Sequence, residues 1–146
     1  RYHSPMKRVV LDTDVMVAAL RSPNGAAAQI LSLATRGQVQ LLISVPLMLE
    51  YEAVLTRPEQ LAAMRAPVEA IQAVLDDFAV LAEEIRGHFR WRPQVRDVND
   101  EMVLEAAVNG RADALVSFNL RDFGDVPARF GVLLCTPGQF LGSLNP

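Results

Sequence analysis

The sequence predicts an α/β fold: a three-layer α/β/α domain around a mostly parallel central sheet of four or five strands. Short runs rich in Val, Ile and Leu alternate with longer segments of helical periodicity, a pattern typical of parallel strands covered on both faces. No apolar run approaches the ~18 residues of a membrane span, so no membrane association is expected. The 146 residues suit one domain. We expect it to cover residues 6–146, with residues 1–5 an added or disordered leader before Met6.

In the first half of the chain, apolar runs predict two strands and 3.6-residue periodicity predicts four helices. In the first predicted helix, Ser22 or Asn24 would be the cap and Gly37 would end it. In the second, Pro46 suits the first turn and Pro58 would end the helix. The strands are expected at 7–13 and 39–45, and the helices at 22–37, 46–55, 59–64 and 67–86.

In the second half, Asp97 or Asn99 would cap a helix that Gly110 closes. The single cysteine, Cys135, falls in a strand-like run and is expected to fill the core. It has no partner for an internal disulfide, which suits a reducing cytoplasm. An edge strand is expected at 89–93, buried strands at 113–118 and 131–136, and helices at 100–109 and 137–144.

Acidic and amide side chains recur where these strands end or the helices begin. Because ligands of parallel sheets bind at the carboxyl ends of the strands, we expect these side chains to meet at one edge. They are Asp12, Asp14, Glu50, Asp100, Asn119 and Asp122. An acid in such a place is often only a helix cap, and Asp14, Asp97 and Asn99 allow that interpretation. Glu50 lies in an otherwise apolar stretch, whereas Glu52 is expected at the surface.

Several carboxylates placed together raise one another's pKa unless a cation lies among them. An all-oxygen set without cysteine or histidine suits Mg²⁺ or Mn²⁺ better than zinc. The sequence therefore predicts a divalent-metal site at this edge of the sheet.

Four blocks of the sequence, in order, resemble the PIN-domain family, in particular its bacterial branch of VapC-like toxins from toxin–antitoxin systems. The blocks are VLDTDVMVAAL, SVPLMLEYEAVLTRP, RDVNDEMVLEAAVNGRADALVSFNLRDF and TPGQFL. The resemblance implies a PIN-like fold and a Mg²⁺- or Mn²⁺-dependent ribonuclease that hydrolyses phosphodiester bonds of single-stranded RNA in the cytoplasm. It also implies an antitoxin protein as partner and a homodimer.

The resemblance also assigns residues. Asp12, Glu50 and Asp100 match the first three acids of the family, and Asn119 stands where many members carry a fourth. It implies catalytic roles for these four residues. Metal ligands would be Asp12, Glu50, Asp100 and Asp122. Asp14, where Asn is more usual, and Ser117, a small hydroxyl position, would support these acids without reacting themselves.

Two alternatives remain open from the residues alone. In a haloacid-dehalogenase-type phosphatase, Asp12 would be the nucleophile and Asp14 the general acid, but the only lysine, Lys7, lies roughly 17 Å of strand away. A PIN-fold binding module without catalysis, acting through protein contacts, is favoured by the uncharged Asn119.

Arginines and aromatics near residue 90 suggest where RNA would bind. Arg90 and Arg92 would contact phosphates and Trp91 would stack on an unpaired base. Arg86 and Arg96 flank this segment, and an edge strand with solvated arginines explains the pattern equally well.

Overall fold

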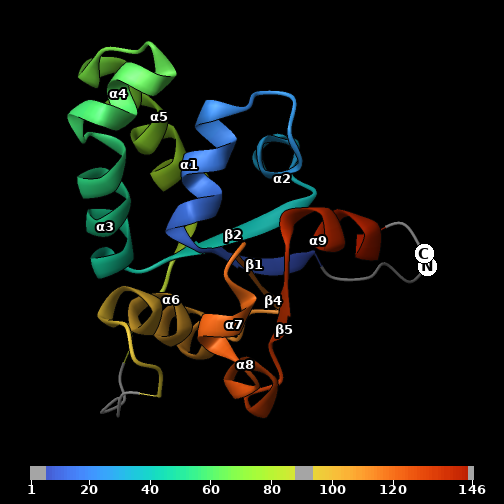
Figure 1. The fold of residues 1–146 in the computed structure, drawn as a ribbon. Helices are drawn as coiled ribbons and strands as arrows, with labels where there is room; N and C mark the ends of the chain where they lie inside the picture. Colours follow the sequence, from blue (N-terminus) through green and yellow to red (C-terminus); the bar gives the residue numbers. More distant parts are fainter. Residues whose placement is uncertain (1–5, 88–93, 145–146) are drawn as a thin grey trace.

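The computed structural model describes residues 6–87 and 94–144. In these ranges a single sheet of parallel strands has the order β3-β2-β1-β4-β5 (Figure 1). The strands are β1 (Lys7–Leu11), β2 (Val39–Ile43), β3 (Glu83–Glu84), β4 (Ala114–Val116) and β5 (Leu133–Cys135).

Helices cover both faces of the sheet, which confirms the predicted three-layer α/β/α architecture. In Figure 1, α1 to α5 lie above the sheet with α9 beside α2, and α6, α7 and α8 lie below it. The helices are α1 (Thr13–Arg21), α2 (Ala26–Thr35), α3 (Val45–Leu55), α4 (Pro58–Met64), α5 (Val68–Leu81), α6 (Val98–Asn109), α7 (Leu120–Phe123), α8 (Val126–Arg129) and α9 (Pro137–Leu144). No helix in the described ranges is long and apolar enough to cross a membrane.

The strand order creates a reversal point beside β1. The chain runs outward from β1 to β2 and β3, then returns to the other side of β1 as β4 and continues to β5. In the register, Val10 of β1 pairs with Leu115 of β4, and Leu11 pairs with Val116. Open α/β sheets bind ligands outside the carboxyl ends of the strands at such a reversal. The fold therefore singles out the place where β1 and β4 end side by side.

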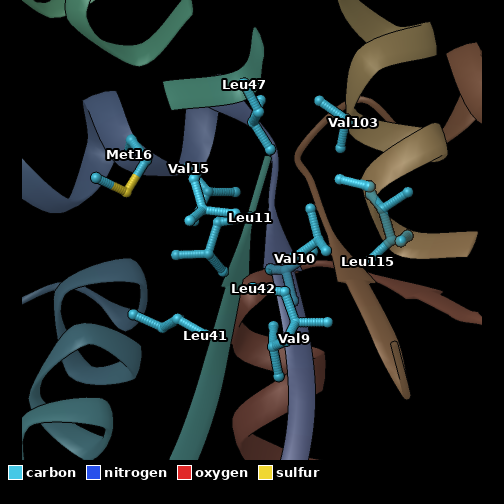
Figure 2. Close-up of a cluster of buried hydrophobic side chains, with 14 of the residues drawn as sticks. Val9, Val10, Leu11, Val15, Met16, Leu41, Leu42, Leu47, Val103 and Leu115 are labelled. Carbon is cyan, nitrogen blue, oxygen red and sulfur yellow. The ribbon is translucent and has the colours of Figure 1, made fainter. Parts of the chain in front are cut away.

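The central strand is buried on both faces and anchors the core. Val9, Val10 and Leu11 have no exposed surface, and Figure 2 shows side chains from neighbouring strands and helices gathered around them. Above the sheet, the ring of Tyr51 in α3 meets Phe78 in α5 edge to face, with 5.5 Å between ring centroids. This packing joins α3 to α5, and the Tyr51 hydroxyl, which donates to the Leu11 carbonyl, joins α3 to the end of β1.

Several local predictions differ from the structure. The segment after Asp12 forms α1, and α7 and α8 follow β4; none of these three helices was predicted. The helix expected over 67–86 ends at Leu81, and Glu83–Glu84 forms β3 instead. Backbone pairing with β2 accounts for this change, and the Ile85 N–H extends the pairing by donating to the Ile43 carbonyl (2.7 Å). The Glu83 carboxylate also binds the Arg8 guanidinium of β1 through two contacts of 2.8 and 3.0 Å.

At the start of α2, Gly25 is the N-cap in place of Ser22 or Asn24. The predicted strand at 89–93 lies outside the described residues. The caps predicted for α6 are confirmed, with Asp97 at its start and Gly110 at its end. Cys135 is buried in β5, as predicted.

Candidate active site

Asp12 lies directly after β1, at the reversal point between β1 and β4. Its backbone N–H donates to the Val116 carbonyl (2.9 Å), which extends the ladder between the two strands by one step. Its carboxylate caps α1 by accepting from the Thr13 N–H (2.8 Å) and also accepts from the Ser117 hydroxyl (2.7 Å). Asp12 is 6% exposed and Ser117 is fully buried. The carboxylate is therefore fixed between the ends of the two strands.

This position is electrostatically unfavourable for a charged carboxylate. Burial raises the pKa of Asp12 above its usual range, and the nearby charges of Asp122 and Asp97 raise it further. The hydrogen bonds from Ser117 and Thr13 act in the opposite direction and stabilise the charged form. A cation at this place would relieve the repulsion.

Asp14 holds the loop that follows β4. One of its carboxylate oxygens, Oδ2, accepts from the Phe118 N–H and from the Asn119 side-chain amide, both at 3.1 Å. The other oxygen, Oδ1, is buried and has no hydrogen-bond partner within the described part of the chain. Burial and the charge of Asp12 raise the pKa of Asp14 to about 6. Asp14 thus carries an oxygen that is free to accept a further donor or a cation.

Asp100 approaches the same edge from below, in the first turn of α6. Its backbone N–H lies 3.3 Å from the Asp97 carboxylate that caps the helix. Burial raises the pKa of Asp100 to about 6, and the charges of Asp12, Asp97, Asp122 and Asp14 contribute in that order. The raised pKa is consistent with Asp100 lying within electrostatic range of the acids that follow β1 and β4.

Glu101 anchors the segment that leads into α6. Its buried carboxylate accepts from the backbone N–H groups of Gln94 (2.7 Å) and Val95 (2.9 Å). This contact fixes the approach to Asp97 and Asp100, so the position of the third acid is set by tertiary structure as well as by the helix.

Asp122 lies at the rim of an open pocket of about 710 Å³ next to these acids. It is exposed, in α7 three residues after Asn119. Its backbone N–H donates to the Asn119 carbonyl (3.2 Å). The pocket is lined by Gln94, Val95, Arg96, Asp97, Asp100, Arg121, Asp122, Phe123, Gly124, Asp125 and Val126.

Glu50 is half-buried on α3, one residue before the buried Tyr51. The Tyr51 hydroxyl donates to the Leu11 carbonyl at the end of β1. Burial raises the pKa of Tyr51 well above its usual value, and the charges of Asp12 and Asp14 add to this. Tyr51 therefore places α3 next to the acids, whereas Glu52, two residues after Glu50, is exposed.

The oxygen ligands present suit a hard divalent cation such as Mg²⁺. They do not form, among the described residues, a site in which protein side chains alone complete the coordination. Within residues 6–87 and 94–144, no three Asp, Glu, His or Cys side chains are close enough to bind one ion. Mg²⁺ is often held by one or two carboxylates, with waters and substrate phosphates as its other ligands. The unpartnered Asp14 Oδ1 and the mutual repulsion of Asp12, Asp14 and Asp100 favour a cation at this edge.

Hydrogen bonds join Asp12 with Ser117 and Asp14 with Asn119, and the raised pKa values of Asp12 and Asp100 indicate that the other predicted acids lie near enough to repel them. Most of the predicted site residues therefore lie at the same edge of the sheet. They are Asp12, Asp14, Asp100, Ser117, Asn119 and Asp122. For Glu50 the structure gives a position on α3 but no bond to this group. Arg90, Trp91 and Arg92 lie outside the described residues.

Sequence reasoning missed two contributors to the site. Tyr51 carries no motif, because its bond to the Leu11 carbonyl joins residues 40 positions apart. Asp97 was interpreted only as a cap, although its charge also raises the pKa of Asp12 and Asp100. Its place one turn before the predicted Asp100 was the available signal.

The fold and the site together define an α/β domain with an acidic edge at the sheet reversal. The family model for the PIN domain matches residues 8–121, and the chain belongs to this family. Among solved structures, the fold is similar to a chain in the crystal structure of VapBC2 from Rickettsia felis bound to a DNA fragment from their promoter. The TM-score is 0.57 and the sequence identity 19%, over 87% of this chain and 96% of the other. A comparison with curated protein sequences finds no match.

Proposed function

We propose that the protein is a metal-dependent endoribonuclease that hydrolyses phosphodiester bonds of single-stranded RNA. The observation that carries the proposal is the hydrogen bond from Ser117 to Asp12, which joins the ends of β1 and β4 at the acidic edge. PIN-family membership supports hydrolysis of nucleic acid as the chemistry of that edge. Lys7 begins β1, at the opposite end of the strand from Asp12, which argues against a haloacid-dehalogenase-type phosphatase.

The cofactor we propose is Mg²⁺ or Mn²⁺, held by Asp12 and Asp100 with waters and substrate phosphate as further ligands. Because no three ligating side chains of residues 6–87 and 94–144 are preassembled, we propose that Asp122 and Glu50 would join as ligands only when the ion binds. When bound, such an ion polarises the scissile phosphate, lowers the pKa of the attacking water and neutralises charge on the leaving oxygen. The Ser117 hydroxyl orients Asp12 by donating to its Oδ2.

The remaining roles belong to side chains on the surrounding elements. We assign Glu50 to accept the proton of the attacking water at its carboxylate, because α3 is placed against the end of β1 by Tyr51. Asp14 positions the Asn119 side chain by accepting from its amide nitrogen. The side-chain oxygen of Asn119, Oδ1, is then available to contact substrate or cofactor. Asn119 is uncharged and does not act as a base.

Cleavage of a labelled single-stranded RNA by the purified full chain tests this proposal. Asp12→Asn and Asp100→Asn should abolish cleavage in Mn²⁺, and EDTA should abolish it in the unmodified protein. Glu50→Gln should also lose activity, whereas the exposed Glu52→Gln serves as the matched control and should retain it. Cleavage that persists in EDTA or in Asp12→Asn would refute the proposal.

We further propose that this ribonuclease is the toxin of a toxin–antitoxin pair and acts in the cytoplasm. The support is the similarity of fold to a chain in the VapBC2 crystal structure, together with the resemblance of the four sequence blocks to VapC-like proteins. An antitoxin protein and a second copy of the chain are the expected partners. Expression in a bacterial host should slow growth, and Asp12→Asn should remove this effect.

The second candidate function is a PIN-fold binding module that acts through protein contacts. It is favoured by one observation: no three ligating side chains in the described ranges are preassembled around a common point. Titration calorimetry distinguishes the two candidates. Saturable binding of Mn²⁺ that Asp100→Asn weakens supports the nuclease, and absence of binding supports the module.

A further inference from the structure

The pocket beside the acids also contains two arginines in a repeated sequence context. Arg96 precedes Asp97 in the segment before α6, and Arg121 precedes Asp122 in α7. All four side chains line the pocket of about 710 Å³, although the two Arg-Asp pairs lie 25 positions apart in the sequence. The fold therefore brings two guanidinium groups to the acidic edge from separate elements.

Within the described residues, the guanidinium groups of Arg96 and Arg121 form no ion pair with the acids around them. The ion pairs formed in the described part of the chain join Arg8 with Glu83, Arg86 with Glu84, and Arg129 with Asp125. Arg96 and Arg121 take part in none of these pairs and are exposed. Asp125, which also lines the pocket, is neutralised by Arg129 from the next turn of chain (3.1 Å).

The acidic edge itself repels an RNA chain. The protein has a formal net charge of −3, and Asp97, Asp100 and Asp122 add negative potential in the pocket. A cation neutralises charge only where it binds, whereas the phosphates on either side of the cleaved bond still need a partner. Exposed arginines are suited to this role, because their planar fork binds phosphate oxygens through two hydrogen bonds.

We propose that Arg96 and Arg121 bind the RNA phosphates that flank the cleaved bond, and that the pocket between α6 and α7 is the path of the strand. This inference rests on the proposed ribonuclease function and adds the substrate contacts of the same site. Arg96 would hold the strand on the α6 side and Arg121 on the α7 side. Phosphate contacts fix position without reading sequence, so these arginines set affinity and register.

Fluorescence anisotropy with a labelled oligouridylate tests the proposal without requiring cleavage. Binding is measured over a series of salt concentrations, in EDTA and again in Ca²⁺, for the wild type, Arg96→Gln, Arg121→Gln and the double variant. Each phosphate contact contributes ~0.7 to the slope of log affinity against log salt for a single strand. Each single substitution should weaken binding and reduce the slope by about 0.7, and the double variant should reduce it by about 1.4.

Arg36→Gln is the matched control. Arg36 is also exposed, but it follows α2 before the start of β2, at the amino ends of the strands. The substitution removes one positive charge at the end of the sheet opposite to the acids, so it should leave the salt slope unchanged. An equal loss in Arg36→Gln would show a general effect of net charge and would overturn the proposal.

The binding and cleavage measurements separate this inference from the proposed function. If the wild type binds RNA with the expected slopes but cleaves nothing in Mn²⁺, the phosphate contacts are supported and the ribonuclease function fails. If the wild type cleaves RNA while Arg96→Gln and Arg121→Gln bind it with unchanged affinity and slope, the phosphate contacts are refuted. The ribonuclease function stands in that case.

Discussion

Removing the Ser117 hydroxyl tests how the two central strands hold the site together. The hydroxyl is buried, donates to Asp12 Oδ2 at 2.7 Å and accepts from the Asn119 N–H at 2.9 Å. A hydrogen bond to a charged group contributes about 1.5–3 kcal/mol. Since the Asn119 N–H is at an exposed residue where water can replace the lost acceptor, we expect Ser117→Ala to lower the free energy of unfolding by about 2 kcal/mol at neutral pH.

The size of this effect should depend on pH. The bond favours the charged form of Asp12, whose pKa is already raised, so its contribution decreases as the carboxylate is protonated. At an acidic pH below the raised pKa of Asp12, we expect the loss to shrink toward about 1 kcal/mol, the value of a neutral hydrogen bond. For a domain of this size, the loss at neutral pH corresponds to a decrease in Tm of about 4–8 °C.

Urea unfolding followed by far-UV circular dichroism measures this effect in the metal-free protein. Ser143→Ala is the control, because the Ser143 hydroxyl donates to the uncharged Phe140 carbonyl within α9 (2.6 Å). Its effect should be independent of pH. A Ser117→Ala variant as stable as wild type, or one equally destabilised at both pH values, would refute the role we give to this bond.

Three further predictions concern the neighbouring groups. Tyr51→Phe leaves the buried Leu11 carbonyl without its donor and should lower the free energy of unfolding by about 1–2 kcal/mol, as measured in urea. The pKa of Asp14 and of Asp100 is raised to about 6, so the folded state binds more protons than the unfolded state between roughly pH 4 and 6. The metal-free protein should therefore lose stability as pH rises through this window. Saturating Mn²⁺ should remove the trend. A Tm of the metal-free protein that does not change with pH would contradict the prediction. Asp14→Asn should weaken Mn²⁺ binding about tenfold in calorimetry, whereas the exchange Asp14→Asn with Asn119→Asp, which restores the carboxylate–amide pair, should recover most of it. Equal affinity for the single variant and the exchange would show that a carboxylate at position 119 does not replace the one at position 14, and would contradict this prediction.

The sheet and most of the acidic edge could be predicted from the sequence because both follow from local patterns. Apolar runs marked the strands, and an acid at the end of a strand such as Asp12 is expected at the carboxyl edge of a parallel sheet. The capping role of Asp97 followed from residue type and position alone. The place of Asp100 at the start of a helix predicted it at the same edge, the family resemblance agreed, and its raised pKa is consistent with that placement.

The remaining features depend on contacts between distant segments. Helix α1 follows β1 without a linker, since Asp12 lies directly after the strand and caps the helix, so no boundary signal separates the two elements in the sequence. The short strand β3 depends on its pairing with β2, about 40 residues earlier in the chain, and its Glu83 also binds Arg8, which is 75 residues away. The hydrogen bond from the Asn119 amide to Asp14 likewise joins distant segments. It offers a structural reason for an uncharged residue at position 119. At this position the amide has a structural partner, and the charge lies on Asp14.

The most direct test of this site is a crystal of the protein soaked in Mn²⁺ and examined by anomalous scattering. We expect a peak at the carboxyl ends of β1 and β4, at the roughly 2–2.6 Å of metal–oxygen bonds from carboxylate oxygens of Asp12 and Asp100. The peak should be absent in crystals of Asp12→Asn. A Mn²⁺ peak elsewhere on the protein, or no peak at this edge in a preparation that cleaves RNA, would contradict the claim that this acidic edge is the active site.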